Sequence, residues 1–310
     1  MTVVKEFILL AFPNLHHFRL LLFVLVLLMY STCVFGNITI IFLVTWYTSL
    51  HTPMYLFIST FAILEIIFVS VMVPKFLHIL ISGKHKISFV GCFTQQFLGN
   101  TMGIVECYLL AVMAFDRDLA INSPFNYISI MSKLKTKLTL CPWIVGFAFA
   151  AILTIFTARL KFCGRNKLDH FFCDLTPLQN LACSGTFVSR AVTNSVAIIA
   201  VLFPFIMIIG LYLHIIVTVS KIKSADGKHK AFSTCSSHLI VASLFFGTAI
   251  IVYVRPNGTQ YDKFLALIYT IVTPLFNPFI YTLRNRDVKT VLFKTFDKLN
   301  FMQKTLRNKS

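Results

Sequence analysis

The chain has 310 residues, of which 57% are hydrophobic and only 13% are charged, and its mean hydropathy is +0.80. Soluble globular proteins carry about 25% charged residues, so this composition excludes a soluble protein and indicates one that lies in a membrane. The net charge of +17 is scattered over connectors and tail rather than gathered on one face. That distribution favours anionic lipid headgroups over nucleic acid as the partner of the basic residues.

Apolar runs of about 20 residues or more, long enough to cross a bilayer, recur along the whole chain. We expect seven transmembrane helices in one bundle, which makes the fold class an all-α membrane protein without a large soluble domain. The expected spans cover residues 18–46, 54–80, 89–119, 138–155, 191–219, 231–254 and 264–283. The third span is the least apolar, with Gln95, Gln96, Asn100, Thr101 and Glu106, so we expect it to be the span most surrounded by protein.

The distribution of Lys and Arg sets the expected orientation, because cytoplasmic connectors carry an excess of both. A cytoplasmic C-terminus places fifteen of the 28 basic residues inside and twelve outside, with Arg117 at the end of the third span. Five of the twelve lie in or beside the longest connector, and long connectors weigh less in this rule. We therefore expect the N-terminus outside and the C-terminus in the cytoplasm.

Covalent modification is expected on the outer side, which is the oxidising one. Four of the eight cysteines lie there, namely Cys92, Cys163, Cys173 and Cys183. Four cysteines allow three pairings, and unrelated free thiols are the alternative. Of three glycosylation sequons only the one at Asn257 is on the outer side, and it lies so near the membrane that its modification is disfavoured.

Three polar residues are expected at membrane depth, namely Glu65, Glu106 and Asn277. A charged side chain in hydrocarbon is costly, so such residues normally face the bundle interior and mark function. The two carboxyl groups predict either a small internal ion or proton site that changes with conformation, or a static hydrogen-bonded network. The residues alone leave both interpretations open.

One face of the third span combines polar and small residues. Gln96, Asn100, Gly103 and Cys107 follow one another at steps of four, three and four residues, which places them on one side of a helix. Space beside them, walled otherwise by apolar side chains, would accept a small, mostly apolar molecule with one or two hydrogen-bonding groups. The alternative is a tight helix crossing, in which Gly and Cys allow close approach.

The chain carries no enzyme signature, because the HExxH, GxSxG and P-loop patterns are all absent from it. The HFFCD segment at 170–174 offers only three possible ligands and is a weak metal site. We therefore expect neither catalysis nor a metal or other cofactor.

Five segments together resemble the vertebrate odorant (olfactory) receptors, which are rhodopsin-like (class A) G-protein-coupled receptors. In the family's order and spacing they are LHTPMYLFIST at 50–60, MAFDRDLAINSPFNY at 113–127, HFFCD at 170–174, KAFSTCSSHL at 230–239 and PLFNPFIYTLRNRDVK at 274–289. The resemblance covers nearly the whole chain. It implies a receptor domain at 1–299, with a short amphipathic eighth helix at about 287–299, and a cytoplasmic tail at 300–310. It also implies a volatile odorant, a stimulatory olfactory-type G protein that raises cyclic AMP, and the plasma membrane of olfactory cilia.

The resemblance assigns roles to individual residues. Asp116 and Arg117 match the family's Asp-Arg pair, in which acids hold the arginine at rest and the arginine meets the G protein when active. The implied activation switches are Tyr212, Asn277, Pro278 and Tyr281.

The resemblance also assigns structural and ligand-binding roles. Gly36 and Asn37 match a Gly-Asn pair in the first span, and Glu65 takes the place of an acid in the second. The implied disulfides are Cys92–Cys173 and Cys163–Cys183. The implied ligand pocket uses Asn100, Gly103, Ile104, Cys107, Phe246, Tyr253 and Thr270.

The chain departs from the family's pattern at three places. Where the family reads MAYDRYVAIC, Asp118 replaces Tyr and Asn122 replaces Cys, so an added acid beside Arg117 is expected to hold it more tightly. Phe246 replaces a Tyr, which removes a hydroxyl from the floor of the pocket. The chain also begins at TVVKEFILL, where family members have a longer N-terminus with a sequon, and this indicates an N-terminally shortened product.

Two alternatives to a working receptor remain at this point. The first is a receptor relic that signals poorly or not at all, because of Asp118 and the short N-terminus. The second is a small-molecule or proton transporter, since Glu65 and Glu106 lie at membrane depth, where transporters bind coupling ions. Transporter folds usually show internal repeats, and the seven spans show none.

Overall fold

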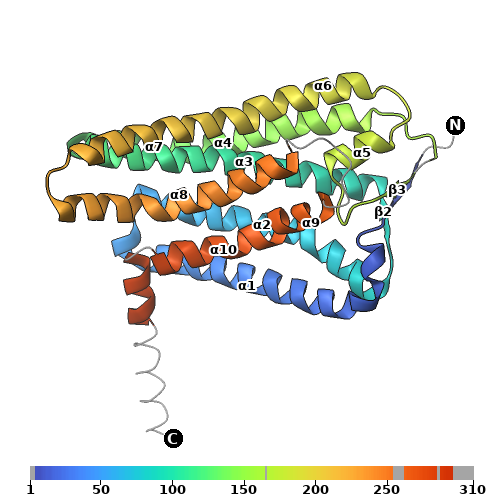
Figure 1. Cartoon of the computed structure of the whole chain (residues 1–310), viewed down its shortest axis with the longest axis horizontal. Helices are drawn as coiled ribbons and strands as arrows, with labels where there is room; N and C mark the ends of the chain where they lie inside the picture. The colour runs from blue at the N-terminus through green and yellow to red at the C-terminus, as the bar shows by residue number, and fades with distance from the viewer. Residues whose placement is uncertain (1–3, 165, 254–261, 285–286, 296–310) are drawn as a thin grey trace, which may run out of the picture.

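A computed structural model describes residues 4–164, 166–253, 262–284 and 287–295 of the chain. The protein is an elongated bundle of long helices that lie side by side (Figure 1). One end of the bundle carries Cys92 and the first strand, and we call it the disulfide end. The other end carries Arg117, and we call it the Arg117 end.

Four uninterrupted helices form the first half of the bundle. They are α1 (Arg19–Trp46), α2 (Pro53–Ser82), α3 (Phe89–Asn122) and α4 (Pro124–Ala158). Pro53 and Pro124 stand in the first turns of α2 and α4, where the fixed φ of proline suits a helix start and its missing N–H is not needed. As a result α4 begins at Pro124 rather than Leu138, and its first, mostly exposed turns extend the expected span at the Arg117 end.

The fifth and seventh membrane segments contain wider, π-helical turns. The fifth is α6 (Thr186–Ala197), a π-helical turn at Ile198–Leu202 and α7 (Phe203–Lys221). The seventh is α9 (Asp262–Leu267), a π-helical turn at Ile268–Val272, α10 (Thr273–Phe279) and a second π-helical turn at Ile280–Arg284. Pro278 has no N–H to offer the carbonyl of Pro274 four residues earlier. The thiol of Cys33 on α1 donates to that carbonyl instead, with an S···O distance of 3.5 Å.

The seven expected spans each correspond to a helix. Six of the described helices are long and apolar enough to cross a membrane. The sixth segment is α8 (Ala225–Tyr253), whose described apolar part, Cys235–Ala249, is shorter. Residues 287–295 are helical in the region of the expected eighth helix, whereas 296–310, and with them the expected tail, lie outside the described residues.

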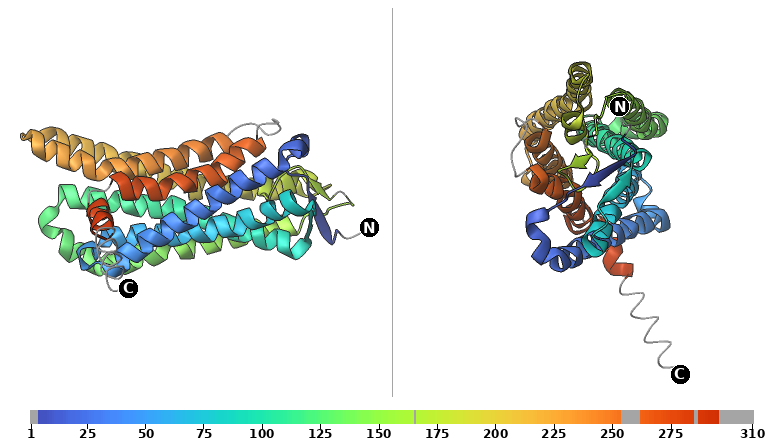
Figure 2. Two further views of the ribbon diagram at one scale, coloured as in Figure 1. Left: turned by 90° about the horizontal axis from the view of Figure 1, so that it is seen from below. Right: turned by 90° about the vertical axis from the view of Figure 1, so that its right-hand side faces the viewer.

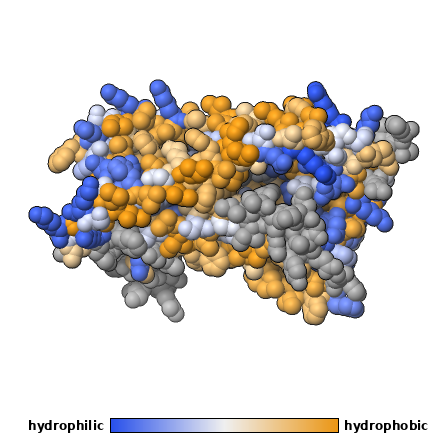
Figure 3. Space-filling view, turned by 45° about the horizontal axis from the view of Figure 1, so that its top comes forward, coloured by the Kyte–Doolittle hydropathy of each residue, from blue (hydrophilic) through white to orange (hydrophobic). Residues whose placement is uncertain are grey.

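The third helix lies at the centre of the bundle, as expected. In its membrane segment 67% of the residues are buried, compared with 17% in α1 and 22% in α4. It packs against α2, α4, α7 and α8, and the end-on view in Figure 2 shows the helices grouped around it. Exposed Leu, Ile, Val and Phe side chains cover the outer flanks of the bundle, as the orange surface in Figure 3 shows.

A small sheet at the disulfide end was not predicted. Its middle strand β1 (Glu6–Leu9) pairs antiparallel with β2 (Lys86–Ser88) and parallel with β3 (Lys167–Leu168). Phe7 of β1 is fully buried, and its ring lies 5.9 Å from that of Phe89 at the start of α3. The N-terminal segment therefore packs into the end of the bundle.

Two disulfides fix the long connector between α4 and α6. Cys92 is bonded to Cys173, and Cys163 is bonded to Cys183. These are the two disulfides that the resemblance implies. The positions of the four cysteines alone allow three different ways of joining them in two bonds. Between them lies the short helix α5 (Leu175–Leu181), which holds the connector over the bundle.

Gly36 on α1 allows a close approach to the seventh segment. A Cβ atom at Gly36 would lie 2.9 Å from the Cβ of Pro278, closer than two carbon atoms pack. We expect Gly36→Ala to destabilise the bundle by about 1–3 kcal/mol, because extra atoms in a packed interface force the helices apart. The measurement is the melting temperature of the detergent-solubilised protein. Gly210→Ala is the matched control, since nothing lies within 4 Å of a Cβ there, and equal melting temperatures for the two variants would contradict the prediction.

Candidate functional site

A cavity of about 550 Å³ lies in the disulfide half of the bundle, where it is bordered mainly by α3, α5, α6 and α8. Its volume is typical of small-molecule pockets, which span about 300–1,000 Å³. Five of the seven predicted ligand residues line it, and they are Asn100, Gly103, Ile104, Cys107 and Phe246. Thr270 is fully buried and does not line the cavity, and the preceding Tyr269 lines it instead, within the π-helical turn. The side chain of Tyr253 and the sequon at Asn257 lie outside the described residues.

The predicted face of α3 borders this cavity rather than a tight helix crossing. Gln96 and Asn100 line the cavity together with the two small residues that follow them on the same face. A Cβ at Gly103 would lie 3.2 Å from the hydroxyl of Tyr269, so the glycine keeps space open there. Close helix packing is instead served by Gly146 on α4, where a Cβ would lie 3.0 Å from the backbone oxygen of Thr101 on α3.

Aromatic side chains form an apolar wall of the cavity. The rings of Phe245 and Phe246 on α8 lie 5.1 Å apart and nearly perpendicular, and Phe205 on α7 lies 5.2 Å from Phe246. Phe246 is almost fully buried. Because it lacks the hydroxyl of a tyrosine, this wall offers a ligand dispersion and hydrophobic contact only.

Polar side chains near the disulfide end of the cavity bond to one another. Gln179 Nε2 donates to Ser189 Oγ at 2.9 Å and to Thr193 Oγ1 at 2.8 Å. Arg190 Nη2 donates to Asn180 Oδ1 at 3.0 Å. These hydrogen-bonding groups are therefore already paired within the protein.

By contrast, two polar side chains of the cavity, both on α3, have groups without a hydrogen-bond partner among the described residues. Gln96 is only 2% exposed, and neither its Nε2 nor its Oε1 has a hydrogen-bond partner among the described residues. The buried Nδ2 of Asn100 also lacks one within that part of the chain. Both side chains line the cavity, so they are free to bond to a ligand.

Asp174 lies at the start of α5, outside the membrane segments, and also lines the cavity. Burial raises the pKa of its carboxyl group to about 6, although a hydrogen bond from the Leu175 N–H opposes the shift. The folded protein therefore binds this proton more tightly than the unfolded chain, and stability falls as the pH rises from about 4 to about 6.

Asp174→Asn is expected to remove that fall, because Asn keeps the cap on α5 but does not ionise. The measurement is the melting temperature of the wild type minus that of the variant, at several pH values. The difference should decrease between pH ~4 and pH ~6 and stay level above, with the wild type relatively less stable at neutral pH. A difference that does not change with pH would contradict the assigned pKa.

A buried polar cluster lies deeper in the bundle. Glu65, Glu106, Asn277 and Asn37 are each at most 2% exposed, so they face the interior as expected. Asn277 Nδ2 donates to Glu65 Oε1 at 2.5 Å, and Glu106 lies beside Glu65. Two adjacent carboxyl groups in an apolar interior require a shared proton or a cation between them, because two like charges repel each other strongly in a low dielectric.

Arg117 is held by its neighbour Asp116 at the opposite end of α3. Arg117 Nε donates to Asp116 Oδ2 at 3.0 Å, and its Nη2 donates to the same oxygen. Tyr127 on α4 donates to Asp116 Oδ1 at 2.7 Å. Asp116 is fully buried and Arg117 is 8% exposed, so the ion pair is shielded from water.

Asp118 forms no ion pair with Arg117 in the structure, so the expectation that it tightens the hold on Arg117 is wrong. Its Oδ1 lies 2.8 Å from Nδ1 of His214 on α7 and accepts a 2.7 Å bond from Asn122 Nδ2. Thr218 on α7 in turn donates to Asn122. Successive residues turn by about 100° around a helix, so Asp116 and Asp118 point to different neighbours. The two replaced residues thus form a polar bridge between α3 and α7.

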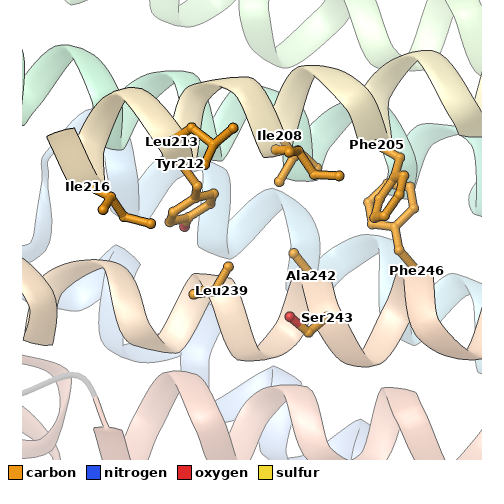
Figure 4. A pocket seen from close by; sticks show the side chains of 10 residues that line it. Phe205, Ile208, Tyr212, Leu213, Ile216, Leu239, Ala242, Ser243 and Phe246 are labelled. Carbon is orange, nitrogen blue, oxygen red and sulfur yellow. The ribbon is translucent and has the colours of Figure 1, made fainter.

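Tyr212 on α7 links to α8 through His238. The Tyr212 hydroxyl is hydrogen-bonded to His238 Nδ1 at 2.5 Å, and the two rings stack with centroids 5.8 Å apart. A mostly apolar crevice of about 190 Å³ lies between α7 and α8. Tyr212 and Leu239 line it from the two helices (Figure 4). Tyr281 is buried, with a hydroxyl that lacks a partner in the described residues. His238 had no predicted role, although a histidine within an apolar span was a visible signal.

Comparison with known proteins agrees with this arrangement. A family model described as "Olfactory receptor" matches residues 26–298. The chain is 42% identical to Olfactory receptor 1468 of Rattus norvegicus, over 96% of each chain, and 42% identical to Olfactory receptor 10A4 of Homo sapiens, over 94% of each. The fold matches that of squid rhodopsin with a TM-score of 0.70 and 18% identity, covering 88% of this chain and 79% of that one.

These matches extend over nearly the whole chain, through all seven membrane segments. They place the chain in a membrane as a multi-pass protein and make it a signalling receptor rather than an enzyme. The protein belongs to the olfactory receptor family of rhodopsin-like G-protein-coupled receptors.

Proposed function

We propose that the protein binds small, mostly apolar volatile molecules in the cavity beside α3 and activates a stimulatory heterotrimeric G protein, which raises cyclic AMP. One observation carries the proposal: a ligand-sized cavity and an acid-held arginine lie on the same central helix, at opposite ends. The helix α8 also connects the two sites, because its Phe246 lines the cavity and its Cys235 lies near Arg117. Ligand binding and the Arg117 end can therefore be coupled through α3 and α8.

A ligand shifts an equilibrium between two conformations only by its different affinity for each. A molecule packed against Phe205 and Phe246 favours the relative position of α7 and α8 that fits it best. In the active arrangement that we propose, α8 moves outward at the Arg117 end, the contact between Tyr212 and His238 changes, and Arg117 leaves Asp116. The opened end then faces the cytoplasm and binds the G protein, in the ciliary membrane of olfactory neurons.

The test is a cyclic AMP reporter assay in cells that display a tagged form of the protein, with a broad odorant panel. We expect at least one compound to raise cyclic AMP, and we expect that response to disappear in cells that lack the stimulatory α-subunit. Surface staining of the same cells is the control. A surface-displayed protein that no compound activates, or a response that persists without the α-subunit, would sink the proposal.

One observation supports a working receptor over a relic. The added acid Asp118 is bonded to His214 and Asn122, so it leaves the pair of Asp116 and Arg117 as it is. Asp118→Tyr should therefore leave basal cyclic AMP unchanged, whereas a relic damaged at this residue should gain signalling on the same change.

We also propose that Glu65 and Glu106 form an internal ion or proton site. Glu65 Oε2 is buried without a hydrogen-bond partner among the described residues, and the second carboxyl group lies next to it. Sodium chloride is expected to raise the melting temperature of the wild type above its value in choline chloride, and Glu106→Gln should abolish the difference. Equal melting temperatures of the wild type in both salts would exclude a sodium site and leave a shared proton or a static network as the explanation.

A further inference from the structure

The two unsatisfied side chains of the cavity indicate which chemical group its ligand carries. Gln96 offers one free acceptor, Oε1, and one free donor, Nε2, while Asn100 offers a free donor, Nδ2. A buried polar group without a hydrogen bond is costly, and native proteins leave few of them. Here these groups border a ligand-sized space, so a bound molecule can supply the missing partners.

The spacing of the two residues allows one small group to reach both. Residues four apart on a helix are neighbours, with Cβ atoms about 5–6 Å apart. Gln96 and Asn100 therefore present two donors and one acceptor within a few ångströms. The opposite wall, with Phe205, Phe245 and Phe246, is apolar and suits a hydrocarbon body.

The lining also determines the charge of the ligand's polar group. Among the described lining residues the charged side chains are Asp174 and Arg190. Asp174 caps α5, and Arg190 donates to Asn180, so both are engaged at the disulfide end rather than on α3. None of the described charged side chains of α3 lines the cavity, so a charged head group between Gln96 and Asn100 would have only amide partners on that helix, and burying it there is costly.

Resting on the proposed odorant function, we propose that the cavity recognises molecules with an apolar body and one uncharged head group that both donates and accepts hydrogen bonds. The head group lies between Gln96 and Asn100. A primary amide or a lactam fits best, because its N–H donates to Gln96 Oε1 and its carbonyl oxygen accepts from Gln96 Nε2 and Asn100 Nδ2. An alcohol can match all three groups only with three hydrogen bonds on a single oxygen atom, a ketone satisfies the two donors, and a hydrocarbon satisfies none.

The experiment measures binding directly, as the thermal stabilisation of the purified receptor by added ligand. The probes share one straight chain and differ in head group: heptanamide, heptanol, heptanone, heptylamine and heptane. We expect heptanamide to act at the lowest concentration, heptanol and heptanone next, and heptane at a concentration at least ~10-fold higher than heptanamide. Heptylamine, which is charged at neutral pH, should be no better than heptane. Equal effects of heptanamide and heptane would overturn the inference.

Variants identify the residues that read the head group. Gln96→Leu and Asn100→Leu are each expected to reduce the preference for heptanamide over heptane by ~10-fold, while heptane itself binds as before. The matched control is Asn194→Leu, which removes an exposed amide of the same cavity on α6 and should keep the preference. A preference that survives both α3 variants would overturn the assignment. If a variant does not fold, the order of the five probes on the wild type decides alone.

Cyclic AMP measured with the same probes separates this inference from the proposed function. Selective binding of heptanamide without any cyclic AMP response would contradict the function and leave the ligand class standing. A cyclic AMP response that is equal for all five probes would support the function and overturn the ligand class.

Discussion

Asp116→Asn is expected to raise basal cyclic AMP well above that of the wild type, at equal surface expression. Asp116 is fully buried and is the carboxylate that pairs with the buried Arg117. Leaving a buried charge without its counter-ion costs about 3–5 kcal/mol. That cost falls on the resting arrangement, because in the proposed active arrangement Arg117 has left Asp116. A difference of about 3 kcal/mol shifts a two-state equilibrium on the order of 100-fold.

Two further variants test how specifically Asp116 holds Arg117 in the resting arrangement. Tyr127→Phe removes one hydrogen bond to the charged Asp116 Oδ1, worth about 1.5–3 kcal/mol, so a smaller rise in basal cyclic AMP is expected. Asp118→Asn is the matched control, because it makes the same chemical change two residues away without touching the ion pair. Basal signalling that rises as much in Asp118→Asn as in Asp116→Asn would refute the assignment of the hold to Asp116.

Loss of the disulfide between Cys92 and Cys173 is expected to abolish surface expression, and loss of the other disulfide to reduce it less. The two bonds join residues 81 and 20 positions apart. By the chain-entropy relation, closing these loops stabilises the folded state by about 4.5 and about 3.3 kcal/mol respectively. Cys173 also anchors the cavity, since its N–H donates to Gln95 Oε1 at 3.0 Å and its neighbours line the space.

The comparison uses the double variants Cys92→Ala/Cys173→Ala and Cys163→Ala/Cys183→Ala, with surface staining and melting temperature as measurements. The second pair is the matched control, because it removes the same bond but does not line the cavity. Equal losses, or a larger loss in the second pair, would contradict the larger role of the bond to α3.

The transmembrane helices could be predicted from the sequence because their signal is local. A run of about 20 apolar residues identifies a span without knowledge of its neighbours. The buried position of Glu65, Glu106 and Asn277 follows from the same physics, since charged and polar groups avoid lipid. The small sheet could not be predicted, because strands of four, three and two residues are too short for an alternating pattern to be recognised, and they pair with segments far away in the chain.

The candidate site likewise has a part that the sequence predicts and a part that it does not. The face of α3 with Asn100 and Gly103 follows from helical spacing, and it does line a cavity. Thr270 was placed in the pocket by analogy, and the structure puts Tyr269 there, since the sequence does not reveal a π-helical turn. The partner of Asp118 was also missed, because His214 is 96 residues away and only the packing of α3 on α7 brings the two together.

In the proposed function, a ligand in the cavity beside α3 controls signalling at the Arg117 end. Ligand-evoked cyclic AMP per surface receptor, compared between the wild type and Gly103→Phe, tests it most directly. The phenylalanine ring would occupy space beside Tyr269 that the glycine keeps open. We expect the response to an activating odorant to fall at least ~10-fold, with basal cyclic AMP and surface staining unchanged. A variant that responds as the wild type does would contradict the claim that the ligand acts from this cavity.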